Sequence, residues 1–226
     1  MGNGDLQKNY NNILHELGPG VQLVAVSKTK PVEDIRALYE LGQRDFGENY
    51  VQELADKHSQ LPSDIRWHFI GHLQSNKVKY IAPFVHLIHG VDSLRLLKEI
   101  NKQAARQNKV IACLLQVHIA REETKFGLDA TELDEVLQAL RVTPQEFTHV
   151  RIRGLMGMAS FTEDQEKVRE EFKGLKTLFD EHFGAAQASP DQHFLLSMGM
   201  SGDYKIAVGE GSNMVRIGSL LFGKRV

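Results

Sequence analysis

The sequence predicts a single (β/α)₈ barrel of the TIM type, an α/β fold, and three observations lead to this prediction. Eight short runs of β-branched or aliphatic residues recur along the chain, segments of helical periodicity separate them, and no long linker interrupts the series. Such alternation is typical of βα units around a parallel sheet. The 226 residues also match the size of an α/β barrel that forms one domain.

Each element of the barrel is expected from the local pattern. The eight runs expected to be strands are Val21–Ser27, Arg44–Gly47, Arg66–Ile70, Leu87–Gly90, Val110–Val117, Arg151–Met156, His193–Ser197 and Met214–Gly218. The segments expected to be helices are Val32–Leu41, Asn49–His58, Ser93–Gln107, Thr131–Leu140 and Glu163–His182. An open doubly wound sheet is the alternative, but no Gly-x-Gly-x-x-Gly turn follows the first strand to support it. We therefore expect one barrel domain over residues 1–226.

Composition and charge narrow the class of partner. With 42% hydrophobic residues, 25% charged residues and a formal net charge of −2, the chain has no basic excess that would favour nucleic acid or an anionic membrane. Its apolar runs are far shorter than the roughly 18 residues of a membrane helix. A single cysteine, Cys113, cannot form an internal disulfide, and the chain opens on polar residues rather than a leader. We expect a cytoplasmic protein that binds a small molecule.

Lys28 stands directly after the apolar run of the first expected strand. In a barrel of parallel strands, the carboxyl-terminal strand ends and the loops after them build the active face. Most lysines are solvated and do no chemistry. An amine held at a partly desolvated rim, however, can form a Schiff base with an aldehyde. Lys28 is therefore the candidate nucleophile.

Small and polar residues follow the seventh and eighth expected strands, in the stretches SMGMSGD (197–203) and VRIGS (215–219). Singly, such stretches are more often ordinary turns. In barrels, however, phosphate often binds between these two loops, and Arg216 adds a guanidinium there. Because the first and last strands of a closed barrel are neighbours, this phosphate cradle would lie near Lys28. An aldehyde and a phosphate on one molecule suggest pyridoxal 5′-phosphate (PLP) as the cofactor.

Six motifs stand in order along the chain: AVSKTKP (25–31), FGENYVQE (46–53), WHFIGHLQSNK (67–77), RGLM (153–156), SMGMS (197–201) and VRIG (215–218). Together they resemble the pyridoxal phosphate homeostasis proteins, a family whose barrel is similar to the N-terminal domain of bacterial alanine racemase. The resemblance runs nearly end to end. It implies the same barrel and the same cofactor.

The resemblance also implies the residues of the site. Lys28 would carry PLP as a Schiff base. Around the cofactor it places Asn49 nearby, Arg216 at the pyridine nitrogen, and Ser201, Gly218 and Ser219 at the phosphate. The family often has asparagine at the position of His118 in this chain, so the polar contacts at the end of the fifth strand are expected to differ.

A metal site finds little support in the sequence. His68 and His72 stand four residues apart near the end of the third expected strand, where both would point the same way. A metal site usually needs a third ligand, and the spacing shows no carboxylate or cysteine close to them. We expect no bound metal.

Two functions remain open, and they belong to different classes. The first is a PLP-binding protein of intracellular PLP homeostasis, which holds the reactive aldehyde and releases it to PLP-dependent apoenzymes. The second is a racemase-like, PLP-dependent amino-acid enzyme, which needs two placed acid/base groups. In alanine racemase the second group is a tyrosine from a separate domain, which we do not expect in a chain that ends at Val226. We therefore expect a monomeric binding protein without robust catalytic turnover.

Overall fold

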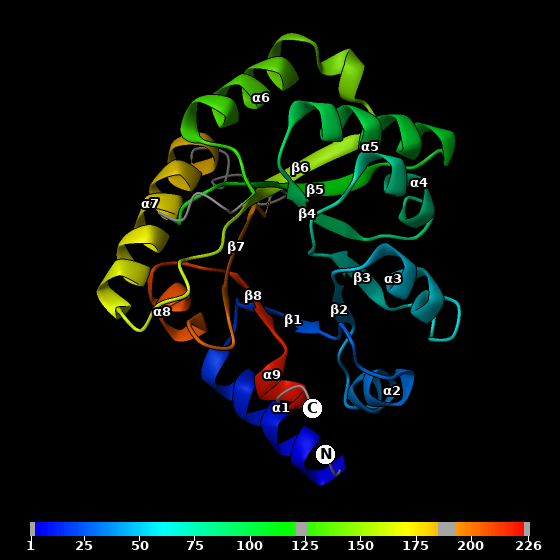
Figure 1. Ribbon diagram of the computed structural model, residues 1–226, viewed down its shortest axis with the longest axis vertical. Helices are drawn as coiled ribbons and strands as arrows, with labels where there is room; N and C mark the ends of the chain where they lie inside the picture. Colours follow the sequence, from blue (N-terminus) through cyan, green and yellow to red (C-terminus); the bar gives the residue numbers. More distant parts are fainter. Residues whose placement is uncertain (1–2, 121–125, 185–192, 224–226) are drawn as a thin grey trace.

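Eight parallel strands close into a barrel in chain order, as the sequence predicts. A computed structural model describes residues 3–120, 126–184 and 193–223, drawn in colour in Figure 1. The strands are β1 (Gln22–Val26), β2 (Asp45–Glu48), β3 (Arg66–Phe69), β4 (Leu87–Val91), β5 (Ile111–Gln116), β6 (Val150–Met156), β7 (Leu195–Met200) and β8 (Met214–Ile217). β1 pairs with both β2 and β8, so the doubly wound alternative is wrong.

Helices surround the strands on the outside of the barrel (Figure 1). They are α1 (Asn3–Leu17), α2 (Val32–Glu40), α3 (Val51–His58), α4 (Val78–Ile81), α5 (Leu94–Arg106), α6 (Ala130–Val142), α7 (Gln165–Phe183), α8 (Tyr204–Gly209) and α9 (Ser219–Phe222), with 3₁₀ turns η1 (Ser75–Lys77) and η2 (Pro144–Phe147). No helix in the described part of the chain is long and apolar enough to cross a membrane.

Helix α1 precedes the barrel and was not expected from the sequence. Its buried residues Leu6, Tyr10, Ile13 and Leu17 recur at helical spacing, but the asparagines between them and Gly4 before them have low helix propensity. The helix is therefore stabilised by the packing of its apolar face and not by intrinsic propensity. It lies beside α9 (Figure 1), where the side chain of Asn9 donates a hydrogen bond to the carbonyl oxygen of Leu221 at 3.3 Å.

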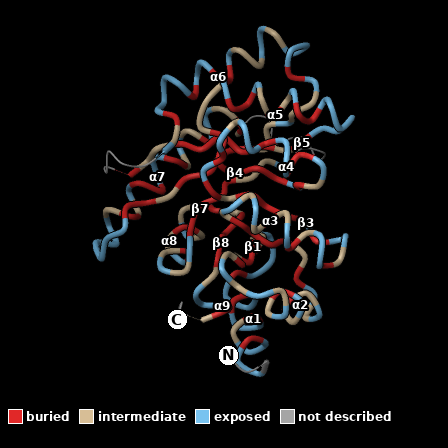
Figure 2. Tube along the Cα trace, turned by 45° about the vertical axis from the view of Figure 1, so that its right-hand side comes forward, coloured by how far each residue is buried: buried red, intermediate tan, exposed pale blue. Residues whose placement is uncertain are grey.

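Burial divides the apolar core into two parts. A large cluster lies between the strands and the helices, and a small one, Val24, Leu87, Leu114, Met156 and Met214, fills part of the barrel interior. Figure 2 shows buried residues along much of the barrel, although only the end of β6 from Gly154 to Met156 is buried. The interior also holds buried polar side chains, among them His68, His89 and Arg216. The barrel interior is thus partly polar, which is costly unless each polar group has a partner.

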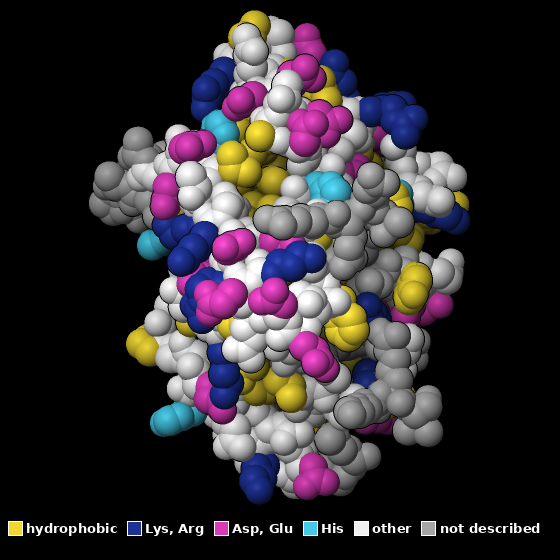
Figure 3. All heavy atoms as spheres, turned by 60° about the vertical axis from the view of Figure 1, so that its left-hand side comes forward, with side chains coloured by type: hydrophobic (Ala, Val, Ile, Leu, Met, Phe, Trp, Pro, Cys, Tyr) yellow, Lys and Arg dark blue, Asp and Glu magenta, His cyan; other side chains and the backbone are white. Residues whose placement is uncertain are grey.

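The surface carries no large field of one sign on the face shown in Figure 3. Acidic and basic side chains are interspersed there, over the side of the molecule that holds α7 and α8. This agrees with the small formal net charge of −2. The described residues of this face therefore present no basic patch of the kind that binds nucleic acid.

At Gly154, strand β6 packs closely against the backbone of β7. The φ of Gly154 is +133°, and a Cβ atom built there would lie 2.0 Å from the carbonyl oxygen of Leu195. We expect Gly154→Ala to lower the free energy of unfolding by more than about 2 kcal/mol, because both the backbone conformation and the space exclude a side chain. The control is Gly174→Ala in α7, where a Cβ meets nothing within 4 Å and the helix should gain roughly 0.5 to 1 kcal/mol. Urea unfolding of both variants measures the difference, and equal stabilities would contradict this reading of β6.

Candidate functional site

All six residues expected at the site line one cavity of about 630 Å³ at the carboxyl-terminal ends of the strands. They are Lys28, Asn49, Ser201, Arg216, Gly218 and Ser219. Apolar side chains complete the wall, among them Ile70 and Met158. A volume of this size, with an apolar wall and a few convergent polar groups, is characteristic of small-molecule sites. The pairing of β1 with β8 brings Lys28, from the early part of the chain, close to Gly218 and Ser219, from its last part.

Lys28 is partly buried and belongs to a tight turn that follows β1. Thr29, the next residue, has a φ of +63°, which is uncommon for a residue other than glycine. Two hydrogen bonds hold this turn: the Thr29 N–H donates to Glu53 Oε1 at 2.6 Å, and the Lys30 N–H donates to the Ser27 carbonyl oxygen at 3.0 Å. The base of the lysine side chain is therefore fixed by its neighbours.

A buried ionic cluster lies against this turn, and sequence analysis missed it. Lys57 Nζ donates to the Ser27 carbonyl oxygen, to Glu48 Oε1 and to Glu53 Oε1, each at 2.7 Å. The Ser27 hydroxyl donates to the same Glu48 oxygen at 2.6 Å. Burial raises the pKa of Glu48, and Lys57 opposes this shift. The i,i+4 spacing of Glu53 and Lys57 on α3 was visible, but their meeting with Glu48 depends on tertiary packing.

Arg216 lies on β8 and is almost fully buried. Its Nη1 donates to the Ser197 carbonyl oxygen at 2.8 Å and to the Ser197 hydroxyl at 2.7 Å, and its Nη2 donates to the Gly157 carbonyl oxygen at 3.1 Å. Burial lowers the pKa of Arg216 to about 10, although Asp203 acts to raise it. The guanidinium therefore remains a cation at neutral pH. Three of its donors are fixed toward the core, while the side chain still lines the cavity.

The loops after β7 and β8 meet at the expected phosphate end of the cavity. The Gly218 N–H donates to the Ser201 hydroxyl at 3.3 Å, which joins the two loops. A Cβ atom at Gly218 would lie 3.1 Å from the carbonyl oxygen of Val26. The close approach that favours glycine here is thus to strand β1. The short helix α8 begins directly after Asp203, which also lines the cavity.

Asn49 follows β2 directly and lines two cavities, the one described and a neighbouring one of about 460 Å³. Its Oδ1 is buried and has no hydrogen-bond partner in the described part of the chain. A buried acceptor without a partner is costly in a finished structure, so this atom is suited to a ligand. His118, by contrast, follows β5 and is absent from the residues that line either cavity.

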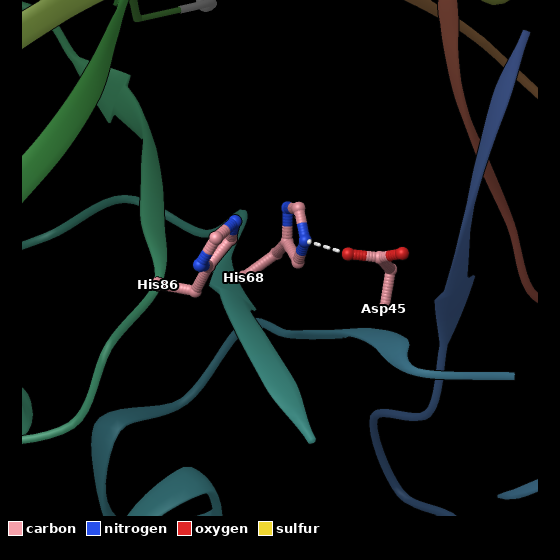
Figure 4. A group of neighbouring side chains, drawn as sticks. All are labelled: Asp45, His68 and His86. Carbon is pink, nitrogen blue, oxygen red and sulfur yellow. Dashed lines mark hydrogen bonds and ion pairs between the residues drawn. The ribbon is translucent and has the colours of Figure 1, made fainter. Parts of the chain in front are cut away.

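The expectation that His68 and His72 point the same way is wrong, because β3 ends at Phe69 and the strand alternation does not reach His72. His68 is buried inside the barrel, whereas His72 is exposed and lies 3.1 Å from Asp92 Oδ2. The structure instead brings His68 close to Asp45 and His86 (Figure 4), with one potential ligand atom of each within 4.8 Å of the others. Barrel packing makes this cluster, so the spacing along the chain could not reveal it.

Comparison with known proteins agrees with this geometry. Residues 3–226 match the family model of the alanine racemase N-terminal domain, which defines the class of barrel. The chain is 42% identical over 205 residues to the pyridoxal phosphate homeostasis protein of Aquifex aeolicus, covering 90% of this chain and 87% of that protein. The corresponding protein of Escherichia coli K12 is 38% identical over 216 residues, covering 91% and 86%. The chain belongs to the family of pyridoxal phosphate homeostasis proteins.

Solved structures show the same relationship. PipY of Synechococcus elongatus, solved with PLP bound, has a TM-score of 0.84 and 34% identity, and the match covers 96% of this chain and 100% of PipY. An alanine racemase of Clostridium difficile has a TM-score of 0.77 at 15% identity, covering 98% of this chain and 57% of the racemase. The second likeness shows the fold alone.

The ionic cluster around Lys57 is expected to contribute to the free energy of unfolding. We expect Lys57→Met to lower the free energy of unfolding by about 3 to 5 kcal/mol, because it leaves the carboxylate of Glu48 buried without its cation. The control is Lys102→Met, whose exposed pair with Glu99 should contribute less than about 0.5 kcal/mol. Urea unfolding at pH 7 measures both. A loss no larger than that of the control would show that the cluster does not stabilise the Lys28 turn.

Proposed function

We propose that this protein binds PLP covalently, as a Schiff base on Lys28, and serves intracellular PLP homeostasis. One observation carries the proposal: the amine, the buried guanidinium and the two small-residue loops line a single cavity. The names of the relatives and the PLP bound to PipY support the same cofactor. The residues present fit that cofactor, since Asn49 also offers a buried acceptor that lacks a partner within the described residues.

The proposed orientation follows from the positions of the polar groups. Lys28 would take the aldehyde end, and Ser201, Gly218 and Ser219 would hold the phosphate with their backbone amides and hydroxyls. Arg216 would face the pyridine nitrogen from the floor of the cavity. The barrel places these groups on neighbouring strands, β1 and β8, and on the loop after β7. Such an arrangement can hold both ends of one small molecule.

Arg216 supports binding rather than catalysis. When bound, PLP promotes carbanion chemistry best if its pyridine nitrogen is protonated. A guanidinium can only donate hydrogen bonds, so a nitrogen that faces it must offer a lone pair. Because Arg216 remains cationic at neutral pH, we propose that the ring stays a weak electron sink and that turnover is not robust. A racemase-like activity, which needs two placed acid/base groups, is the alternative.

We also propose that this protein acts in the cytoplasm as a monomer and that PLP-dependent apoenzymes receive its cofactor. The single cysteine supports a reducing compartment, because Cys113 is buried in β5 and has no second cysteine to pair with.

Borohydride reduction tests the attachment. Reduction of the PLP-loaded protein, followed by peptide mapping, should place the pyridoxyl group on Lys28, and Lys28→Ala should abolish it without loss of fold. Lys30→Ala is the matched control, because Lys30 lies on the same turn but its Nζ donates to the Phe222 carbonyl oxygen at 3.1 Å. A pyridoxyl group found on Lys30 or Lys77 would refute the assignment.

Isotope exchange tests the absence of turnover. We expect the PLP-loaded protein to exchange the Cα proton of L-alanine with deuterium very slowly or not at all, because Arg216 disfavours the protonated ring. Proton NMR in D₂O measures the exchange, with an alanine racemase as the positive control. Exchange within minutes would favour the racemase-like alternative.

A further inference from the structure

Five buried side chains form a continuous hydrogen-bonded series through the barrel interior. Arg216 Nη1 lies 2.7 Å from Ser197 Oγ, which lies 3.2 Å from His89 Nδ1. His89 Nε2 lies 2.9 Å from His68 Nδ1, and His68 Nε2 lies 2.9 Å from Asp45 Oδ1. None of the five is more than 5% exposed. The series therefore joins Arg216, at the floor of the cavity, to Asp45, the first residue of β2 at the opposite end of the barrel.

Each end of this series can act in only one way: Arg216 donates hydrogen bonds and Asp45 accepts them. A guanidinium carries five N–H donors and no acceptor, so Arg216 can only donate. At the other end, burial would raise the pKa of Asp45, but hydrogen bonds from Arg66 and His68 outweigh it and hold that pKa well below its usual value. Arg66 donates to both carboxylate oxygens, at 2.8 and 2.6 Å. Asp45 is therefore an ionised carboxylate that can only accept, and His68 Nε2 must carry the proton between them.

With both imidazole rings neutral, the two ends determine the direction of every bond between them. Burial lowers the pKa of His89 well below its usual value, and the positive charge of Arg216 acts in the same direction, so this ring is neutral. When His68 is neutral as well and donates from Nε2, it must accept at Nδ1, and His89 then donates from Nε2 and accepts at Nδ1. The Ser197 hydroxyl must donate to His89. Its lone pair is thereby turned to Arg216.

We infer that Asp45, His68 and His89 are positioning residues that orient the Ser197 hydroxyl and so hold the Arg216 guanidinium in place beneath the cavity. The inference rests on the proposed function in one respect, that Arg216 faces the cofactor. The core-side donors of the Arg216 guanidinium meet only neutral oxygens. The aligned bonds let the remote charge of Asp45 polarise these partners.

The same carboxylate and imidazole also belong to the cluster with His86 that resembles a metal site (Figure 4). A cation there would compete with Arg66, which already neutralises Asp45 and donates to both of its oxygens. It would also have to remove the proton that His68 Nε2 donates to Asp45. The arrangement therefore fits the anchor of the hydrogen-bonded series better than a metal site.

The first test needs no cofactor. In the unloaded protein, labelled with ¹⁵N in histidine and arginine and measured at pH 8, we expect His68 and His89 as Nε2–H tautomers and a resolved, slowly exchanging Arg216 guanidinium signal. Asp45→Asn and His68→Gln should broaden that signal, whereas His86→Gln, beside the series but outside it, should leave it sharp. An Nδ1–H tautomer at either ring, or an Arg216 signal unaffected by both variants, would overturn the inference. So would Zn²⁺ binding that shifts the signals of His68 and His86 together.

The second test uses the PLP-loaded protein. Asp45→Asn and His68→Gln should shift the visible absorption band and speed PLP release by about three- to tenfold, as expected when one charged hydrogen bond is weakened but not lost. His86→Gln should change release by less than twofold. Variants with the band and release rate of the unsubstituted protein would overturn the link to the cofactor. If the unsubstituted protein itself binds no PLP, the proposed function fails, and the Arg216 signal in the unloaded protein alone decides the inference.

Discussion

The pairing of β1 with β8 is the constraint on which the site depends. The register places Val24 beside Arg216 and Ala25 beside Ile217, so the turn that carries Lys28 lies next to the loop that begins at Gly218. These two segments come from opposite ends of the chain. Hydrogen bonds of the sheet hold them together only because the barrel closes. Gly218 shows how close the approach is, since any side chain there would press on the carbonyl oxygen of Val26.

Two buried polar networks meet this rim from different sides. One, centred on Lys57, packs against the turn of Lys28 and ties α3 to the ends of β1 and β2. The other crosses the barrel interior and ends at Arg216. Buried charges are costly to desolvate and often add little net stability compared with apolar packing. Their proposed value here is geometric, because one supports the turn that carries Lys28 and the other holds the Arg216 guanidinium beside the cavity.

The relation to alanine racemase concerns the barrel, whereas the site carries the function. A TM-score of 0.77 at 15% identity shows that the two chains share a fold, and it says nothing about activity. The proposed difference in behaviour depends on one residue and its surroundings. A guanidinium at the ring nitrogen restrains the electron sink whatever the barrel around it. If the barrel interior holds the guanidinium in one place, the ring nitrogen faces the same donor for as long as the cofactor is bound.

The sequence by itself predicted the eight strands, the barrel that they form and six of the residues that line the cavity. Short apolar runs, separated by segments of helical periodicity, predict the strands. Lys28, Arg216 and Gly218 stand at or near strand ends that a closed barrel must bring together. Other features were decided by the tertiary structure alone. Helix α1 forms because its apolar face is covered, and Glu48 meets Lys57 only after α3 packs on β2. The series from Asp45 to Arg216 depends on side chains from five strands, whose depth inside the barrel is set by register and twist. Periodicity shows which face of a strand is buried, but a hydrogen bond requires two atoms within about 3 Å, and only the packed barrel sets that distance.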